Sequence, residues 1–127
     1  MTVLGYTLCG LIAAGIVFIG ARFLWQPAVA SAAFGIADSP PPSTGLTGWL
    51  AVKGLRDIVS GLFVVLLMAS GSPRLLGEFM LVASLIPLGD AAIVLRSGGS
   101  RTAAFGIHGV TALVIIAAGA SLLAAAS

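Results

Sequence analysis

Four long apolar stretches, separated by short polar or turn-forming segments, dominate the sequence. They cover about residues 3–21, 47–70, 74–95 and 102–126. A transmembrane helix needs about 20 mostly apolar residues to cross ~30 Å of hydrocarbon. The pattern therefore predicts an all-α fold, a four-transmembrane-helix bundle, and the chain 1–127 is expected to be one integral membrane domain.

The segment between the first two stretches, residues 23–46, is too irregular to span a bilayer. Its apolar patch, residues 28–36, is too short to cross, and the run Pro40-Pro41-Pro42 cannot continue a helix. We expect a proline-rich interfacial or re-entrant segment that lies against the bundle, with Trp25 at headgroup depth. A surface loop with an aromatic anchor is the alternative.

The connections between the later stretches are short, which makes the second, third and fourth helices antiparallel neighbours. In Gly71-Ser72-Pro73, Ser72 is expected to cap the third helix and Pro73 to occupy its first turn. Pro87 removes a backbone hydrogen bond within the third helix. A kink is therefore expected beside Asp90.

The composition excludes a soluble protein. Of the 127 residues, 59% are hydrophobic and 8% are charged, whereas soluble domains have roughly a quarter of their residues charged. Soluble enzymes, nucleic-acid binders and secreted disulfide scaffolds are therefore excluded, and a lipid bilayer is the expected surrounding. One cysteine allows no internal disulfide. Without a glycine-rich phosphate loop or an acidic metal cluster, no cofactor and no metal site are expected.

The first apolar stretch has a competing interpretation as a cleavable signal peptide. No basic segment precedes it, and its apolar run exceeds the usual length of a signal peptide's hydrophobic region. We therefore expect it to be the first span, closed by Arg22.

The cations predict the orientation in the membrane, because Lys and Arg are in excess on the cytoplasmic side. One side holds Arg74 alone, and Glu78 can pair with it at i,i+4. The other side, reached after the first span, holds Arg22, Lys53, Arg56, Arg96 and Arg101. We expect a multi-pass protein of the cell membrane with both termini outside and the proline loop inside.

Nearly all ionisable groups inside the predicted spans lie at one depth, towards the expected cytoplasmic side. At 1.5 Å per residue, those of the second span lie roughly 9 to 15 Å from its start, Asp90 about 8 Å before the end of the third, and His108 about 9 Å into the fourth. Charged groups are unfavourable in lipid, so they should face inwards. The expected site contains Trp49, Lys53, Arg56, Asp57 and Ser60, which share an arc of about 100°, together with Asp90, His108 and Thr111.

The residue types suggest how this site would work. Asp90 and His108 are the candidate catalytic residues, because a carboxyl and an imidazole can move a proton, and His108 is the group expected to titrate nearest neutral pH. On an α-helical wheel Phe105 lies on the same face as His108. The expected ligand-binding residues are Trp49, Lys53, Arg56, Asp57 and Thr111.

A buried pair involving Arg56 is expected, because an unpaired guanidinium at membrane depth would be unfavourable. Its partner should be Asp57 or Asp90. The alternative is that the polar residues only fix how apolar helices pack. Interhelical hydrogen bonds in membranes contribute under about 1 kcal/mol on average, so stability alone is a weak reason to keep these charges.

Four parts of the sequence carry a family resemblance: Ala21-Arg22-Phe23-Leu24 with Pro27, residues 48–61, Pro87-Leu88-Gly89-Asp90 and His108-Gly109. They resemble a small four-helix membrane protein family described only as a domain of unknown function. In size and layout the chain is also similar to the DoxX-like group of four-span proteins. The resemblance implies the fold and the membrane, and it implies no activity.

Two classes of function fit these observations. In the first, a pocket open to the inner leaflet binds or isomerises a lipophilic small molecule, and Asp90 or His108 moves a proton. In the second, the polar layer is the relay of a small proton-coupled transporter. The outer halves of the helices are almost purely apolar, which favours the one-sided pocket. A homo-oligomer, or a packing subunit of a larger membrane complex, is compatible with the same pattern.

Overall fold

The computed structural model of the chain describes residues 2–37, 40–41 and 43–127, and within these ranges it contains helices and no strand. The expected all-α fold is confirmed. The elements are α1 (Thr2–Trp25), α2 (Pro27–Phe34), α3 (Thr44–Ala69), α4 (Pro73–Ala83), α5 (Leu85–Arg96), the π-helix η1 (Thr102–Gly109) and α6 (Val110–Ala126).

Local chemistry at the helix ends explains these boundaries. Pro27 occupies the first turn of α2, and Gly35 ends that helix with φ +97°, a conformation that favours glycine. The Ser43 side chain accepts a hydrogen bond from the backbone N–H of Leu46 at the start of α3. Ser72 caps α4 in the same way, and Pro73 follows it. The predicted cap and tight connection are therefore confirmed.

The apolar patch before the prolines folds as α2, a helix too short to cross a bilayer. It packs against α1 and α3, so it is an ordered helix and not a surface loop. Pro40 and Pro41 are non-helical, as expected. Asp38, Ser39 and Pro42, which also belong to the predicted proline-rich segment, lie outside the described residues.

The third apolar stretch is interrupted at Ser84, where α4 ends and α5 begins. Pro87 has no N–H to donate to the carbonyl one turn earlier, at Ala83, and its ring crowds that carbonyl. The expected irregularity is therefore present, but it lies a turn before Pro87 instead of beside Asp90.

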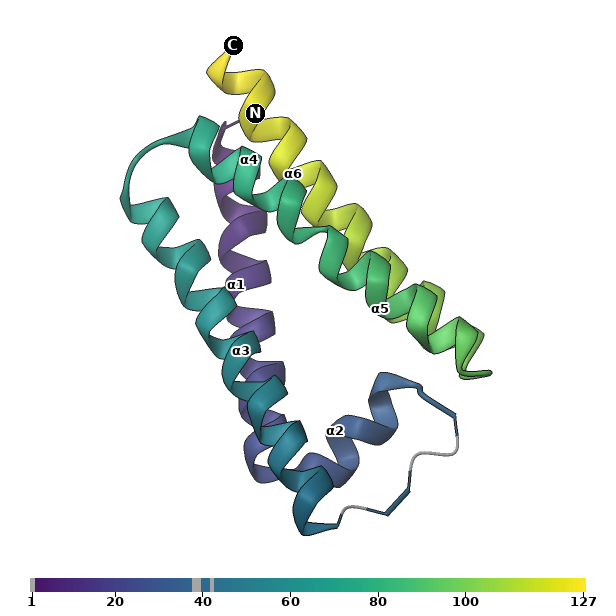
Figure 1. Cartoon of the computed structure of the whole chain (residues 1–127). Helices are drawn as coiled ribbons and strands as arrows, with labels where there is room; N and C mark the ends of the chain where they lie inside the picture. Colours follow the sequence, from purple (N-terminus) through teal and green to yellow (C-terminus); the bar gives the residue numbers. More distant parts are fainter. Residues whose placement is uncertain (1, 38–39, 42) are drawn as a thin grey trace.

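Glycine contacts join the helices in two pairs, α1 with α3 and α4 with α6 (Figure 1). A Cβ atom added to Gly20 or to Gly54 would meet the carbonyl oxygen of the other at 2.5 Å. Gly77 and Gly119 form the same contact between α4 and α6, at 3.0 Å. Small residues thus let the backbones approach closely in the absence of a hydrophobic force between helices in lipid.

The two pairs meet near the chain termini and diverge towards α2 (Figure 1). At the first end, which we call the closed end, Gly5 lies against Ser121 and Leu122. The core cluster of buried residues fills this end: Cys9, Ala13, Val64, Leu76, Met80, Ile115, Ala118 and Leu122. At the other end, the open end, α2 lies between the pairs. The helix pairs are therefore splayed at this end, and the four-transmembrane-helix bundle that the sequence predicted is not confirmed.

Three helical segments are long and apolar enough to cross a membrane, namely Thr2–Trp25, Pro73–Arg96 and Thr102–Ala126, with mean hydropathies of 2.1, 1.8 and 2.2. The chain is therefore a multi-pass membrane protein by length and composition. α3 has 26 residues, which is sufficient length, but Lys53, Arg56 and Asp57 lie near its middle. Because of these three charges, α3 is not among the three apolar segments named above.

Candidate functional site

A cavity of about 260 Å³ lies between the two helix pairs, bounded by the closed-end core on one side and by α2 on the other. Its walls are mainly apolar. The lining residues are Ile12, Ile16, Phe18, Ile19, Arg22 and Phe23 of α1; Ala30, Ala33 and Phe34 of α2; Lys53, Asp57, Ser60 and Val64 of α3; Phe79, Met80, Ala83, Ile86, Pro87 and Asp90 of α4 and α5; and Ile107, His108, Thr111 and Ile115 of η1 and α6.

On the α3 side, the polar part of the cavity contains an ion pair held among aromatic rings. Lys53 Nζ lies 2.6 Å from Asp57 Oδ2, and their side chains are 33% and 14% exposed. The same ammonium lies 4.5 Å from the ring centre of Phe23 and 5.1 Å from that of Phe34. Cation–π contacts of this kind stabilise a partly desolvated ammonium. The pair and the rings therefore hold a charge at the cavity wall.

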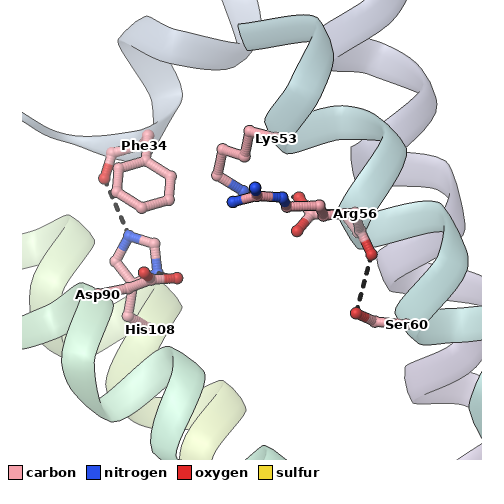
Figure 2. Close-up of polar contacts among 7 residues, drawn as sticks. Phe34, Lys53, Arg56, Ser60, Asp90 and His108 are labelled. Carbon is pink, nitrogen blue, oxygen red and sulfur yellow. Dashed lines mark hydrogen bonds and ion pairs between the residues drawn. The ribbon is translucent and has the colours of Figure 1, made fainter. Parts of the chain in front are cut away.

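Facing them, His108 is held by the backbone of α2 (Figure 2). Its Nε2 lies 3.0 Å from the carbonyl oxygen of Phe34, and the two rings lie 4.5 Å apart at 56°. A carbonyl oxygen only accepts hydrogen bonds, so Nε2 carries the proton and donates it. The other ring nitrogen, Nδ1, faces Asp90 Oδ2 at 3.9 Å. The imidazole and the carboxyl therefore face each other at a distance slightly longer than a hydrogen bond.

The π-helical turn of η1 places His108 in this position. His108 is 7% exposed, whereas Phe105, three residues earlier, is 60% exposed. The prediction that both lie on one face is wrong, because a π-helix has hydrogen bonds from i to i+5 and a wider turn, so an offset of three does not return to the same side. Isolated π-helical turns are frequent at functional sites.

α2 connects the two helix pairs across the open end. Phe34 contacts Lys53 of one pair and His108 of the other. The carbonyl oxygen of Gly35 accepts a hydrogen bond from the backbone N–H of Ser100, at 3.0 Å, in the loop before η1. Closing the cavity at this end therefore depends on a helix of eight residues.

Arg22 adds a further cation to the cavity wall. Its Nη2 donates a hydrogen bond to the side-chain oxygen of Gln26, at 3.1 Å. Its Nε is buried and has no hydrogen-bond partner within the described part of the chain. None of the ion pairs found there includes Arg22.

Of the seven residues predicted to be catalytic or ligand-binding, the structure places five at the cavity wall. Trp49 and Arg56 do not line the cavity; Trp49 is 74% exposed, and Arg56 is exposed. The predicted pairing of Arg56 with Asp57 or Asp90 is wrong, because Asp57 pairs with Lys53 and Asp90 faces His108. The residues found at the cavity wall are Lys53, Asp57, Asp90, His108 and Thr111.

The position of Arg56 on the helical wheel of α3 explains why the sequence predicts it, wrongly, to line the cavity. Lys53, Asp57 and Ser60 follow one another at offsets of four and three, so they share the centre of that face. Arg56 and Trp49 lie at one edge of the predicted arc of about 100°, where a small rotation of the helix turns them out of the cavity.

Sequence reasoning missed the three α1 and α2 residues Arg22, Phe23 and Phe34. From the sequence, Arg22 is predicted to end the first span and to lie on the cytoplasmic side, but not to belong to the site. Because α1 and α3 are antiparallel, the end of one helix lies beside the start of the other, and this relation could have placed Arg22 near Lys53. Nothing in the sequence indicated that Phe34 would turn back into the cavity.

Among the described residues, no three His, Cys, Asp or Glu side chains lie close enough together to hold a metal ion. Cys9 is fully buried in the closed-end core, away from His108.

Comparison with protein-family models gives a match for most of the chain. A family model described as Domain of unknown function (DUF4267) matches residues 13–122, a range that contains all the cavity-lining residues except Ile12. No curated protein and no solved structure matches the chain.

Proposed function

The chain belongs to this family of unknown function, and we propose, from its site, that it is a membrane protein whose cavity binds a lipophilic small molecule with one polar end. The supporting observation is the cavity itself. Its walls are apolar towards the closed end, and its charged and hydrogen-bonding side chains are gathered towards α2. Ligand sites combine a mainly apolar lining with a few convergent polar groups in this way.

The size of the cavity limits the ligand. At about 260 Å³ its volume is slightly below the ~300–1,000 Å³ that small-molecule sites occupy. One acyl chain or a small ring system fits this space better than the two chains of a phospholipid.

His108 and Asp90 give the proposed site a means of proton transfer. The hydrogen bond to the Phe34 carbonyl fixes the ring so that Nδ1 faces Asp90, 3.9 Å from its carboxyl oxygen. A ligand atom inserted beside them could receive or lose a proton there, which is the requirement for general acid–base catalysis or isomerisation. Lys53, on the opposite wall, would then stabilise negative charge on the ligand.

A proton-coupled transporter is less well supported by this arrangement. Transport would need polar groups that lead to both faces of the membrane. Among the described residues, the closed end is filled by apolar side chains, of which Leu76, Met80 and Leu122 are fully buried. The observations therefore favour a site that opens on one side.

We further propose that α3 is the fourth span and that the open end faces the cytoplasm of a cell-membrane protein. The charged side of α3 that lines the cavity is covered by the other helices, which reduces the penalty of placing it in lipid. Arg22, Arg96 and Arg101 all lie at or beside the open end, as cytoplasmic cations would. Cysteine substitutions test the orientation: Gly45→Cys should resist an impermeant reagent added to intact cells, and Ser70→Cys should react, whereas the reverse pattern would contradict it.

Native mass spectrometry of protein purified from native membranes in a neutral detergent tests the ligand proposal. The wild-type protein should carry a small molecule of constant mass. Ala83→Phe, which fills the cavity, should lose it, and Ala92→Phe, which adds the same ring on the exposed face of α5, should retain it. Asp90→Asn and His108→Ala should reduce the bound fraction. Purification of the wild type without any bound molecule, or equal retention by both Phe variants, would contradict the proposal.

A further inference from the structure

Arg22 is the cavity-lining cation that has no acidic partner among the described residues. Lys53 is paired with Asp57, and Asp90 faces His108 at 3.9 Å. The guanidinium of Arg22 is left with one neutral partner, Gln26. Its Nε–H is buried and has no hydrogen-bond partner among the residues that the structure describes. The positive charge of Arg22 at the cavity wall is thus not neutralised by a carboxylate among these residues, so an anionic bound group would be favoured.

We infer that the cavity takes a single-chain amphiphile with an oxyanionic head, a carboxylate or a phosphate, and that Arg22 binds that head. This inference rests on the proposed function. A guanidinium presents its donors in a planar fork, which matches the two oxygens of such a head and gives short, charge-assisted hydrogen bonds. Gln26 accepts from Nη2. The Nε atom is buried, so the head would bind the remaining Nη donors of the fork.

The wall of α1 suggests where the acyl chain would lie. Ile19, Ile16 and Ile12 line the cavity at offsets of three and four, so they form one apolar track that leads from Arg22 towards the closed end. From Arg22 to Ile12 the helix rises about 15 Å. Three covalent bonds advance a fully extended chain by about 3.6 Å, so roughly twelve carbons cover this distance.

The depth of Arg22 agrees with this orientation of the ligand. It lies three residues before the end of α1, next to α2 and the open end. An anionic head would therefore sit near the membrane interface, where water can solvate its remaining oxygens, and the chain would point into the hydrocarbon region. The distribution of polarity in the cavity thus parallels that of an amphiphile in a leaflet.

Binding of three probes of equal chain length tests the inference: dodecanoate, dodecyl phosphate and dodecanol. Each is titrated into the purified full chain in neutral detergent at a pH at which both acids are ionised, and bound fractions are measured by native mass spectrometry. The wild type should bind at least one anion about tenfold more tightly than dodecanol, a difference of ~1.4 kcal/mol. The better anion identifies the head as a carboxylate or a phosphate.

Substitutions at Arg22 separate this inference from the proposed function. Arg22→Gln should lower anion binding about tenfold and leave dodecanol binding unchanged. Arg22→Lys, which keeps the charge but lacks the planar fork of donors, should bind the anion with intermediate affinity. Arg74→Gln is the matched control, because Arg74 is paired with Glu78 at the other end of the protein and should not affect any probe.

The outcomes distinguish the two claims. If Arg22→Gln keeps the full preference for the anion, or if Arg22→Lys binds it as tightly as the wild type, the assignment of Arg22 is wrong, even when Ala83→Phe blocks dodecanol. If the wild type binds none of the three probes, or if Ala83→Phe leaves dodecanol binding unchanged, the cavity does not bind amphiphiles, and the proposed function fails with the inference.

Discussion

The closed end and the open end of the molecule are built from the same helices but pack in different ways. At the closed end, small and aliphatic residues leave Cys9, Leu76, Met80 and Leu122 without solvent exposure. At the open end the pairs separate, and Lys53, Asp57, Asp90 and His108 line a cavity that α2 covers. Packing at the closed end can therefore hold the pairs together and allow the open end to remain hollow and polar. We expect stability to depend on the first end and ligand binding on the second.

The largest loss of stability is expected from a cavity made at the closed end. Leu122→Ala removes a side chain with 0% exposure and should lower the free energy of unfolding by about 2–5 kcal/mol. Leu113→Ala, on the same helix but 68% exposed, is the control and should change it by less than ~0.5 kcal/mol. Unfolding in mixed detergent micelles measures both. Equal losses would mean that the closed end is not the stabilising core.

Glycine contacts within a pair should give the next largest effect. In Gly20→Ala the new Cβ would overlap the carbonyl oxygen of Gly54, so α1 and α3 must separate, and we expect a loss of about 1–3 kcal/mol. Gly15→Ala meets no atom within 4 Å and should be neutral or slightly stabilising. This comparison shows whether close contact within the pair persists at the open end. A neutral Gly20→Ala would show that the helices are farther apart there.

The smallest effect should come from the open-end charges. Asp57→Asn leaves Lys53 without its carboxylate and should lower stability by about 1 kcal/mol, because the pair is partly exposed and the two aromatic rings still face the ammonium. Arg56→Gln, one residue earlier, removes no ion pair found in the described chain and should change stability by less than ~0.5 kcal/mol. A larger loss of stability for Arg56→Gln would indicate that Arg56 does form the ion pair that the sequence predicted.

The two ends also differ in how far the sequence predicts them. Apolar runs, the cap at Ser72 and the prolines have local physical causes, so the helices and their approximate ends follow from the sequence. The convergence of Asp90 and His108 follows as well, because both lie a similar distance from the ends of neighbouring helices. The sequence therefore predicts most of the architecture and the depth of the site.

The splay of the pairs and the details of the site depend on tertiary contacts instead. Close backbone contacts at Gly20 and Gly77 determine which helices pair. The sequence has seventeen glycines and does not show which of them make such contacts. An α-helical wheel does not apply to the π-helical turn around His108, so it does not predict which residues share a face with that histidine. Phe34 enters the site only because α2 turns back between the pairs.

A crystal structure grown from a lipid mesophase tests the central claim most directly. We expect it to show the two helix pairs apart at the open end, with elongated density that begins at Arg22, passes Lys53 and His108, and continues along Ile16 and Ile12. If the pairs instead close around fully paired charges and leave no cavity, the polar residues fix helix packing, and the ligand-binding account is wrong.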